Sequence, residues 1–328
     1  MSKRILLLVH KELVPPIEKN LKPNRDSSPW ITEYDVAQTL INLNYTVEFC
    51  GLLDSIDPLL QKIETFKPQI VFNLLEEFSF NVRNDYKVVA LLDLLKIKYS
   101  GCGPKGLLLG RDKALCKKIL THHRLGTPPF YTFPKNKKRK LPKHLKFPLI
   151  IKCLFEEASY GIAKASVVHS EEKFQERLAY IHNKLDQDAI VEEFIPGKEL
   201  YVGIIGHKRL TVLPIWELKF SKVQNPETEI YSSQAKWNKN YRDRKGIKSG
   251  PADLDKITQE RIIKACKKAY QVLELTGHAR IDLRLTSEGK IYILEVNPNP
   301  NIALDDEFAL SALHAQIKYP ELIEKLLP

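Results

Sequence analysis

Apolar and polar positions follow two alternating periods along the first hundred residues. Short apolar runs predict buried strands, at 4–9, 46–50 and 69–73. Amphipathic stretches between and after them predict helices, at 32–43, 58–65 and 86–95. Strands that alternate with helices are typical of an α/β domain with a parallel sheet. A glycine- and proline-containing run at 99–104 ends this pattern, so we place a domain boundary there.

The rest of the chain is less regular. Helices are predicted at 112–123, 171–183 and 254–275, and strands at 147–153, 164–169, 189–194 and 200–205. The polar stretch 224–250 resembles a flexible connection. At 328 residues, the chain has room for about two or three structural units, each around its own core.

Two predicted strands near the C-terminus, joined by a turn at 286–289, carry a cluster of polar side chains. The first strand places Arg280 and Asp282 on one face, and the second places Glu295 and Asn297 on one face. If the strands pair, two carboxylates and an amide oxygen converge beside a guanidinium. Oxygen ligands of this kind suit Mg²⁺, which prefers one or two carboxylates together with phosphate oxygens and water. The alternative is an ordinary hairpin whose charged face is solvated.

Composition and charge limit the classes of protein to which this chain could belong. Hydrophobic residues at 43% and charged residues at 28% exclude extensive disorder, and no apolar run approaches the roughly 20 residues that span a bilayer. Five scattered cysteines without a C-x-x-C pair favour reduced thiols and a cytoplasmic location. The net charge of +11 favours anionic partners. The basic segment 135–146 has no aromatic residue for base stacking, so a solvated connection is favoured over a nucleic-acid contact.

Several residues could contact a nucleotide. Lys152 lies in an apolar strand, where an unpaired ammonium is costly, so it needs an anion such as phosphate, unless it simply reaches the surface. Lys113 begins a helix and could present its charge and free N–H groups to phosphate. The polar turn at 156–161 ends in glycine and could close over phosphates. Neither a P-loop nor a dinucleotide-binding fingerprint occurs.

The strand end at 192–195 offers what an adenine requires. It combines backbone amide and carbonyl groups with the aromatic ring of Phe194, and Glu199 follows where it could accept hydrogen bonds from ribose hydroxyls. The alternative is a buried strand with a charged end.

The order of these groups resembles that of the ATP-grasp superfamily and, within it, the D-alanine–D-alanine ligase group. The matching elements are Tyr99-Ser100-Gly101-Cys102, Lys113, Lys152, the turn 156–161, Glu192-x-x-Ile195, Gly197-x-Glu199, Lys236, Arg280-x-Asp282 and Glu295-x-Asn297. The resemblance runs from the first strand to about Asn301. It implies a preATP-grasp α/β domain with a parallel sheet at 1–104, then a central lid domain at 105–190 and a C-terminal domain at 191–328 that clasp ATP between their sheets.

The resemblance also implies roles for individual residues. Lys113, Lys152 and Lys236 would contact ATP phosphates, under the turn that contains Ser159. Glu192, Glu193 and Ile195 would hold adenine and Glu199 the ribose, while Asp282, Glu295 and Asn297 would bind two Mg²⁺, with Mn²⁺ as a possible substitute, and Arg280 would stabilise charge on the intermediate. These roles imply a ligase that forms an amide from a small-molecule carboxylate and amine through an acylphosphate. The alternative is a module of the same fold that binds ATP without ligation; a homodimer is possible.

The expected acceptor site departs from the resemblance. Ligases of the group carry a Thr-Ser-Pro-Gly-type run and then a Ser-Leu pair that receives the acceptor's carboxylate. This chain has the run 298–301 (Pro-Asn-Pro-Asn), and then Asp305, Asp306 and Glu307. The group's histidine and Gly-Glu-Asp-Gly loop after the third strand are also absent. Three carboxylates would repel an anionic acceptor, so we expect an amine- or cation-bearing acceptor and a substrate pair other than two D-alanines.

Overall fold

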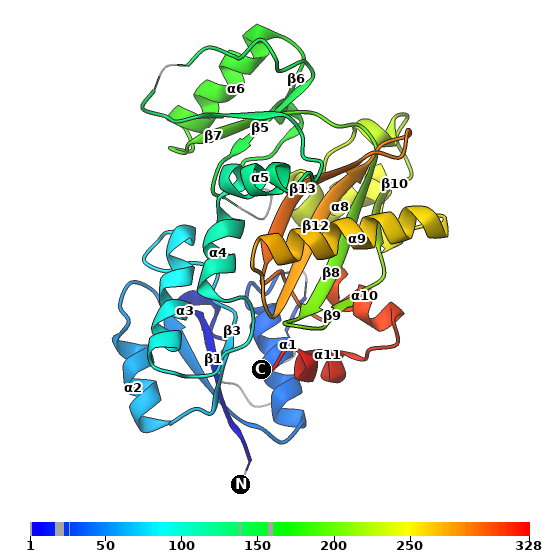
Figure 1. Ribbon diagram of the computed structural model, residues 1–328. Coiled ribbons are helices and arrows are strands. Elements are labelled where there is room, and N and C mark those ends of the chain that lie inside the picture. The colour runs from blue at the N-terminus through cyan, green and yellow to red at the C-terminus, as the bar shows by residue number, and fades with distance from the viewer. Residues whose placement is uncertain (1, 17–22, 26, 138, 157–159) are drawn as a thin grey trace.

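The computed structural model describes residues 2–16, 23–25, 27–137, 139–156 and 160–328. Its N-terminal part is a three-stranded parallel sheet in the order β2 (Thr46–Leu52), β1 (Arg4–His10), β3 (Ile70–Asn73). Helices α1 (Ile31–Asn42), α2 (Asp57–Thr65) and α3 (Asp85–Leu94) surround it (Figure 1). These elements confirm the alternation predicted for the first hundred residues.

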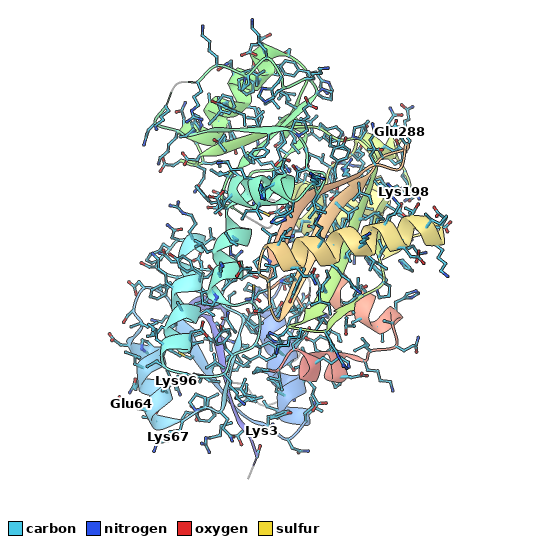
Figure 2. All side chains as sticks on the ribbon, in the orientation of Figure 1. Lys3, Glu64, Lys67, Lys96, Lys198 and Glu288 are labelled. Atoms are coloured by element: carbon cyan, nitrogen blue, oxygen red, sulfur yellow. The ribbon has the colours of Figure 1, made fainter. Side chains whose placement is uncertain are left out.

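The middle strand β1 shows why this part folds as a parallel sheet. Its side chains from Ile5 to Val9 are fully buried. Ile5 and its odd-numbered neighbours pack with α1, whereas Leu6 and Leu8 pack with α2 and α3 on the other face. An unbroken apolar run is what a strand covered on both faces requires. Charged side chains such as Glu64, Lys67 and Lys96 are left on the outside (Figure 2).

A four-stranded antiparallel sheet forms the middle of the chain. Its order is β4 (Phe130–Phe133), β7 (Ala189–Glu193), β5 (Leu149–Cys153), β6 (Val167–Val168). Helix α6 (Glu171–Asn183) covers it and buries Phe174 and Ile181 against the strands. The strand expected at 164–169 is only two residues long, because a 3-10 turn occupies 164–166. Strand β4 was not predicted.

The largest sheet has the order β11 (Ile247–Pro251), β10 (Trp216–Phe220), β8 (Lys198–Gly206), β12 (His278–Leu285), β13 (Ile291–Pro298), with β9 (Leu210–Val212) beside β8. Helix α9 (Lys256–Val272) lies across one face (Figure 1) and buries Ile262 and Cys266. The stretch expected to be flexible contains α7 (Ser233–Trp237), α8 (Lys239–Lys245) and β11, because Ala235 and Tyr241 pack against Trp216 and Phe220.

Helices at the junctions connect these sheets. The unpredicted α4 (Pro104–Arg111) and the predicted α5 (Lys113–His122) lie between the N-terminal sheet and the other two (Figure 1). The C-terminal helices α10 (Glu307–His314) and α11 (Tyr319–Lys325), also unpredicted, return to the N-terminal core, where Phe308 and Leu322 join the same cluster as Val36. The boundary expected at residue 190 falls inside β7; the three-domain division stays a prediction.

The five cysteines are all buried free thiols. Within the described ranges, no helix has both the length and the apolar character needed to cross a bilayer.

Candidate nucleotide and metal site

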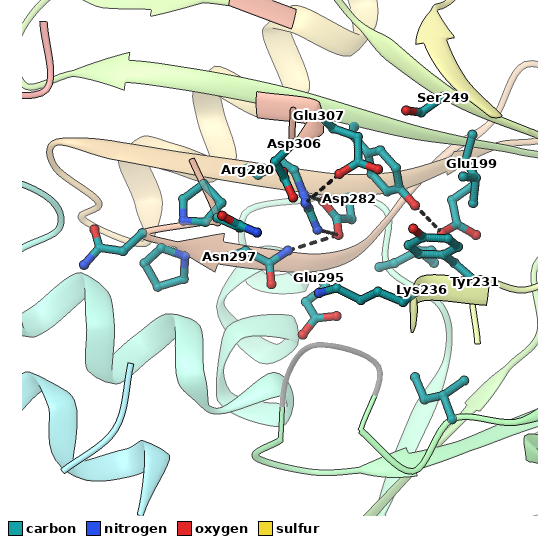
Figure 3. A pocket seen from close by; sticks show the side chains of 18 of the residues that line it. Glu199, Tyr231, Lys236, Ser249, Arg280, Asp282, Glu295, Asn297, Asp306 and Glu307 are labelled. Carbon is teal, nitrogen blue, oxygen red and sulfur yellow. Dashed lines mark hydrogen bonds and ion pairs between the residues drawn. The ribbon is translucent and has the colours of Figure 1, made fainter. Parts of the chain in front are cut away.

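One cavity of about 670 Å³ is lined by residues from all three sheets (Figure 3). It brings together most of the residues predicted from the sequence: Lys152, Glu192, Glu193, Ile195, Glu199, Lys236, Arg280, Asp282, Glu295, Asn297, Asp305, Asp306 and Glu307. Lys113 does not line the cavity, but it pairs with Glu295, which does line it. Ser159 lies outside the described residues. Side chains separated by more than a hundred positions in the sequence therefore share one solvent-accessible space.

The hairpin of β12 and β13 forms the floor of this cavity. The strands pair as predicted, with Arg280 opposite Asn297 and Asp282 opposite Glu295. The amide Nδ2 of Asn297 donates to Oδ2 of Asp282 at 3.0 Å. Arg280 donates two hydrogen bonds to the same carboxylate, from Nε to Oδ1 at 2.8 Å and from Nη2 to Oδ2 at 3.0 Å. A register shift follows Asp282, where the strict alternation of the two strands is interrupted.

The two hairpin carboxylates differ in their electrostatics. Burial raises the pKa of Asp282 to about 6, although Arg280 opposes this shift. Burial also acts to raise the pKa of Glu295, but Lys113 and Lys152 outweigh it and hold that pKa below its usual value. The Nζ of Lys113 lies 2.9 Å from Oε1 of Glu295. Each carboxylate is thus already paired with a cationic side chain, Asp282 with Arg280 and Glu295 with Lys113.

The donor set of the hairpin fits a hard divalent cation. Asp282 and Glu295 offer carboxylate oxygens, and the amide of Asn297 leaves its oxygen available while its nitrogen is bonded to Asp282. Mg²⁺ takes one or two carboxylates and completes its shell with water or phosphate oxygens. The described residues contain no cluster of three or more His, Cys, Asp or Glu side chains with metal-binding geometry. The set therefore suits an ion that shares its shell with a ligand rather than a closed protein cage.

A buried chain of charges connects the hairpin to β7. The Nζ of Lys152 lies 3.0 Å from Oε2 of Glu192, so the anion that this partly buried lysine requires is supplied by the protein itself. A second lysine, Lys117 on α5, lies 3.3 Å from Oε1 of the same carboxylate and donates to the Leu294 carbonyl at 2.7 Å. Burial acts to raise the pKa of Glu192, but the two lysines lower it overall.

The expected adenine and ribose positions lie where β7 leads into β8. Phe194 and Ile195 line the cavity. The side chain of Glu193 accepts from the Lys146 backbone N–H at 2.9 Å. Glu199 pairs with Arg284 at 2.7 Å and accepts from the Tyr201 hydroxyl at 3.0 Å.

Alternation along the strand places Arg284 on the same face as Arg280 and Asp282, but no role was predicted for it. It is 3% exposed and donates to the backbone carbonyl oxygens of Glu227 and Glu229 at 2.8 and 2.6 Å. Its alternation with apolar residues was the available signal. Arg284 thus holds a neighbouring loop and Glu199 in fixed positions.

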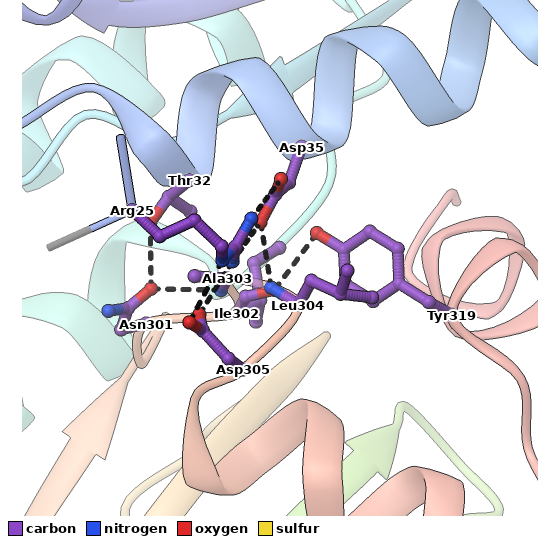
Figure 4. A network of polar contacts seen from close by, with 9 residues as sticks. All are labelled: Arg25, Thr32, Asp35, Asn301, Ile302, Ala303, Leu304, Asp305 and Tyr319. Atoms are coloured by element: carbon purple, nitrogen blue, oxygen red, sulfur yellow. Dashed lines mark hydrogen bonds and ion pairs between the residues drawn. The ribbon is translucent and has the colours of Figure 1, made fainter. Parts of the chain in front are cut away.

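The segment that follows the hairpin is tied to the N-terminal part of the chain (Figure 4). Arg25 donates to both carboxylate oxygens of Asp35, at 2.9 and 2.8 Å, and to both oxygens of Asp305, at 2.9 and 2.6 Å. Asp35 also accepts from the Leu304 backbone N–H at 2.9 Å. The hydrogen bond from Arg25 holds the pKa of Asp305 below its usual range. Asp305 therefore holds its loop in place and does not present a free carboxylate.

The two acidic residues after Asp305 have a different environment. The Oδ1 atom of Asp306 is buried without a hydrogen-bond partner. Burial and the neighbouring Glu307 raise the pKa of Asp306 to about 7. Glu307 lies 3.8 Å from Nη1 of Arg280, an ion-pair distance too long for a hydrogen bond. All three carboxylates line the cavity, but only Asp305 has both oxygens hydrogen-bonded to an arginine.

A further carboxylate of the cavity was missed in the sequence. Glu33 on α1 is 4% exposed, and its Oε2 has no hydrogen-bond partner. Burial raises its pKa to about 7. Glu33, Asn73 and Asn299 all line the cavity. Each asparagine also has a buried Nδ2 without a hydrogen-bond partner. No local pattern distinguishes Glu33 from other acidic residues in the first turn of a helix.

Comparison with known proteins identifies the family. A family model described as the D-ala D-ala ligase C-terminus matches residues 120–328, well over half of the chain. The chain belongs to the D-alanine–D-alanine ligase family. A D-alanine–D-alanine ligase of Pelagibacter ubique is 29% identical over 304 residues, which cover 90% of this chain and 91% of that protein. An uncharacterized protein of Sinorhizobium fredii is 27% identical over 277 residues, covering 82% and 79%.

Solved structures agree with this assignment at the level of the fold. A D-alanine–D-alanine ligase of Bacillus anthracis complexed with ATP has a TM-score of 0.76 and 20% sequence identity, over 99% of this chain and 96% of that one. The protein is thus an ATP-grasp ligase that forms a carbon–nitrogen bond, and its family uses ATP, a divalent metal and small-molecule substrates. Family membership favours this activity over the non-catalytic ATP-binding module considered above.

Proposed function

We propose that this ligase uses ATP and Mg²⁺ to join a small-molecule carboxylate to an amine other than D-alanine through an acylphosphate. The observation that carries the proposal is the contrast between the two ends of the cavity. Lysines and the paired hairpin carboxylates gather at one end. Asp306 and Glu307 lie beyond Arg280, whose guanidinium is bonded to Asp282 and is 3.8 Å from Glu307, and Oδ1 of Asp306 has no hydrogen-bond partner.

The chemistry follows from the weakness of a carboxylate as an electrophile. The γ-phosphoryl group of ATP moves to the carboxylate oxygen, which gives the acylphosphate and ADP. The amine then attacks the acyl carbon, phosphate leaves with the C–O bonding electrons, and the amine loses a proton. Lys113, Lys152 and Lys236 would neutralise phosphate charge, and Arg280 would stabilise charge on the intermediate. Positioning and charge neutralisation supply most of the catalysis in phosphoryl transfer.

Asp282, Glu295 and Asn297 would hold the Mg²⁺, which when bound neutralises charge between the phosphate groups. At present Arg280 and Lys113 occupy the carboxylate oxygens, so these two cationic side chains would yield part of their contacts. Glu193 and Ile195 would hold adenine through their backbone, beside the buried Glu192, and Glu199 would accept from the ribose. The five buried thiols support a reducing, cytoplasmic setting.

The acceptor would be an amine whose far end carries a cation or a hydrogen-bond donor. A free carboxylate would meet the buried, unpartnered oxygen of Asp306 and the carboxylate of Glu307. Like charges at close range discriminate strongly against a ligand. Asp305 is excluded from this role because both of its oxygens are bonded to Arg25.

Three amines of equal length test the acceptor end directly. 1,4-Diaminobutane, 4-amino-1-butanol and 4-aminobutanoate differ only in whether the far end is cationic, neutral or anionic. Calorimetry with Mg²⁺ and a non-hydrolysable ATP analogue should rank their affinities in that order, and Asp306→Asn should weaken the diamine about tenfold. Glu321→Gln, an exposed carboxylate on α11, should leave the ranking unchanged. Equal affinities, or a preference for 4-aminobutanoate, would overturn the assignment of the acceptor end.

A screen tests the overall reaction. Carboxylate and amine pairs would be assayed for ADP release, and the product would be identified by its mass. We expect ADP release that requires the carboxylate, the amine and Mg²⁺. We also expect a product lighter by one water than the sum of the two substrates. ADP release without an amide product would contradict it.

A further inference from the structure

We propose that Lys117 is a positioning residue of the nucleotide site, which shares the carboxylate of Glu192 with Lys152 and so leaves Lys152 charge to offer a phosphate. The inference rests on the proposed function, because it concerns how ATP is held. Lys117 is 1% exposed and does not line the cavity, whereas Lys152 does. Lys117 therefore acts through its neighbours and does not touch the nucleotide.

The position of Lys117 on α5 explains why it can reach two strands. It lies four residues after Lys113, so both lysines project from the same face of the helix. Lys113 pairs with Glu295, and Lys117 donates to the carbonyl of the preceding residue, Leu294, at 2.7 Å. Lys117 also lies 3.3 Å from Glu192 on β7. One buried ammonium thus connects the strand of the metal ligands to the strand beside the adenine position.

The charges around Glu192 do not balance within the protein. Glu192 is 1% exposed and has two lysines in ion-pair contact, Lys117 and Lys152. Lys113 pairs with Glu295, a carboxylate on which Lys152 and Lys117 also act. Together, the three lysines and two carboxylates carry one positive charge more than they neutralise. An excess charge in a buried setting attracts an anion strongly, and of Lys117 and Lys152 it is Lys152 that lines the cavity.

Loss of Lys117 would change this balance without touching the ligand. Glu192 would keep Lys152 as its one cation, and the group would become neutral. The triphosphate would then have to compete with Glu192 for the ammonium of Lys152. Removing one partner of a buried ion pair is ordinarily destabilising, but Glu192 would keep Lys152 as a counter-charge, so the carboxylate would not be left unpaired. A lysine that served only the fold would instead alter stability and leave phosphate recognition unchanged.

Calorimetry with separate halves of the nucleotide tests the proposal. Inorganic tripolyphosphate and adenosine would be titrated, each with Mg²⁺, into the full-length protein and its Lys117→Met variant. We expect tripolyphosphate affinity to fall about tenfold or more, with adenosine affinity within twofold of the unchanged protein. Lys118→Met is the matched control, because Lys118 is the next residue of α5 and is exposed. It should bind both probes as the unchanged protein does.

A second variant has the opposite expected sign. Glu192→Gln removes the carboxylate that holds both lysines, so tripolyphosphate should bind more tightly, by about threefold or more. Lys117→Gln keeps a donor for the Leu294 carbonyl but no charge, and it should lose tripolyphosphate affinity as Lys117→Met does. These two variants decide the question if Lys117→Met fails to fold.

The outcomes separate this inference from the proposed function. Unchanged tripolyphosphate affinity in folded Lys117→Met or Lys117→Gln would overturn the role of Lys117 alone. Equal losses of tripolyphosphate and adenosine affinity would also overturn it, because they would indicate a general disturbance of the site. An unchanged protein that binds neither tripolyphosphate nor ATP would overturn the proposed nucleotide site, and the inference with it.

Discussion

The two ends of the cavity are built in different ways. At the nucleotide end, the charged residues project from paired strands and one helix, as in the hairpin of Asp282 and Glu295 and the pair of Lys152 and Glu192. At the acceptor end, loops from opposite ends of the chain meet, and Arg25 joins Asp305 across 280 positions. Regular elements fix the first end locally, whereas tertiary contacts fix the second. An acceptor site of this kind can change its chemistry while the nucleotide site is retained.

The two ends of the cavity also differ in the charges that they carry. Three lysines meet two carboxylates in the nucleotide half, at Lys113, Lys117, Lys152, Glu192 and Glu295. At the acceptor end, Oδ1 of Asp306 is buried without a hydrogen-bond partner, and Glu307 lies 3.8 Å from Arg280. The cavity therefore presents positive charge to a polyphosphate and negative charge to an acceptor.

Removal of a hairpin carboxylate should have the largest effect. Asp282→Ala or Glu295→Ala should lower turnover on the order of a hundredfold or more, because the metal that stabilises phosphoryl transfer would lose a ligand. The measurement is ADP release at saturating ATP over a range of Mg²⁺ concentrations. Glu288→Ala, an exposed carboxylate in the turn of the same hairpin (Figure 2), should be unaffected. Unchanged ADP release in Asp282→Ala would count against the metal site.

Loss of Arg25 should have an intermediate effect, confined to the acceptor end. Arg25→Ala removes the bonds to Asp35 and Asp305, so the loop before Asp306 should become less ordered. We expect the KM for the acceptor to rise about tenfold, with the KM for ATP unchanged. Hydrogen exchange should quicken at the Leu304 amide, which is bonded to Asp35.

The control for this variant is Arg209→Ala, which removes an exposed arginine from the turn between β8 and β9. It should change neither KM nor the exchange of Leu304. A rise in the KM for ATP in Arg25→Ala equal to that for the acceptor would show that the two ends are not independent.

The smallest expected effect is the pH dependence of stability that Glu33 contributes. Because burial raises its folded-state pKa from 4.5 to about 7, the folded protein keeps a proton that the unfolded chain has lost between these values. This contribution is present at low pH and is lost as the pH rises through about 7. Glu33→Gln should be more stable than the unchanged protein at pH 8, on the order of 1 kcal/mol after the cost of an unpartnered amide, and no more stable at pH 5.

Urea unfolding at the two pH values measures this difference. Glu12→Gln, an exposed carboxylate outside α1, serves as the control and should show no such crossover. A stability gain in Glu33→Gln that is the same at pH 5 and pH 8 would contradict the raised pKa.

The sequence predicted the parts of the molecule that depend on local periodicity. The apolar run of β1 and the alternation of Arg280 and Asp282 along β12 each imply a face, and those faces are the ones observed. The pairing of β12 with β13 followed because the turn between them is short.

Other features had no local signature. Lys117 lies on an amphipathic helix in which a lysine is ordinarily solvated, and only the meeting of α5 with β7 and β13 buries it. Asp305 could not be separated from Asp306 and Glu307, since Arg25 is far away in the sequence. The order within 224–250 likewise comes from packing on Trp216 and Phe220 and not from its own composition.

The central claim is that a retained nucleotide end serves an altered acceptor end. The most direct test is ADP release with Mg²⁺ and ATP, with D-alanine as the sole added substrate in one reaction and a pool of carboxylates with 1,4-diaminobutane in another. We predict no release above background in the first reaction and clear release with a new amide in the second. Release driven by D-alanine alone, with no response to the diamine, would contradict the account.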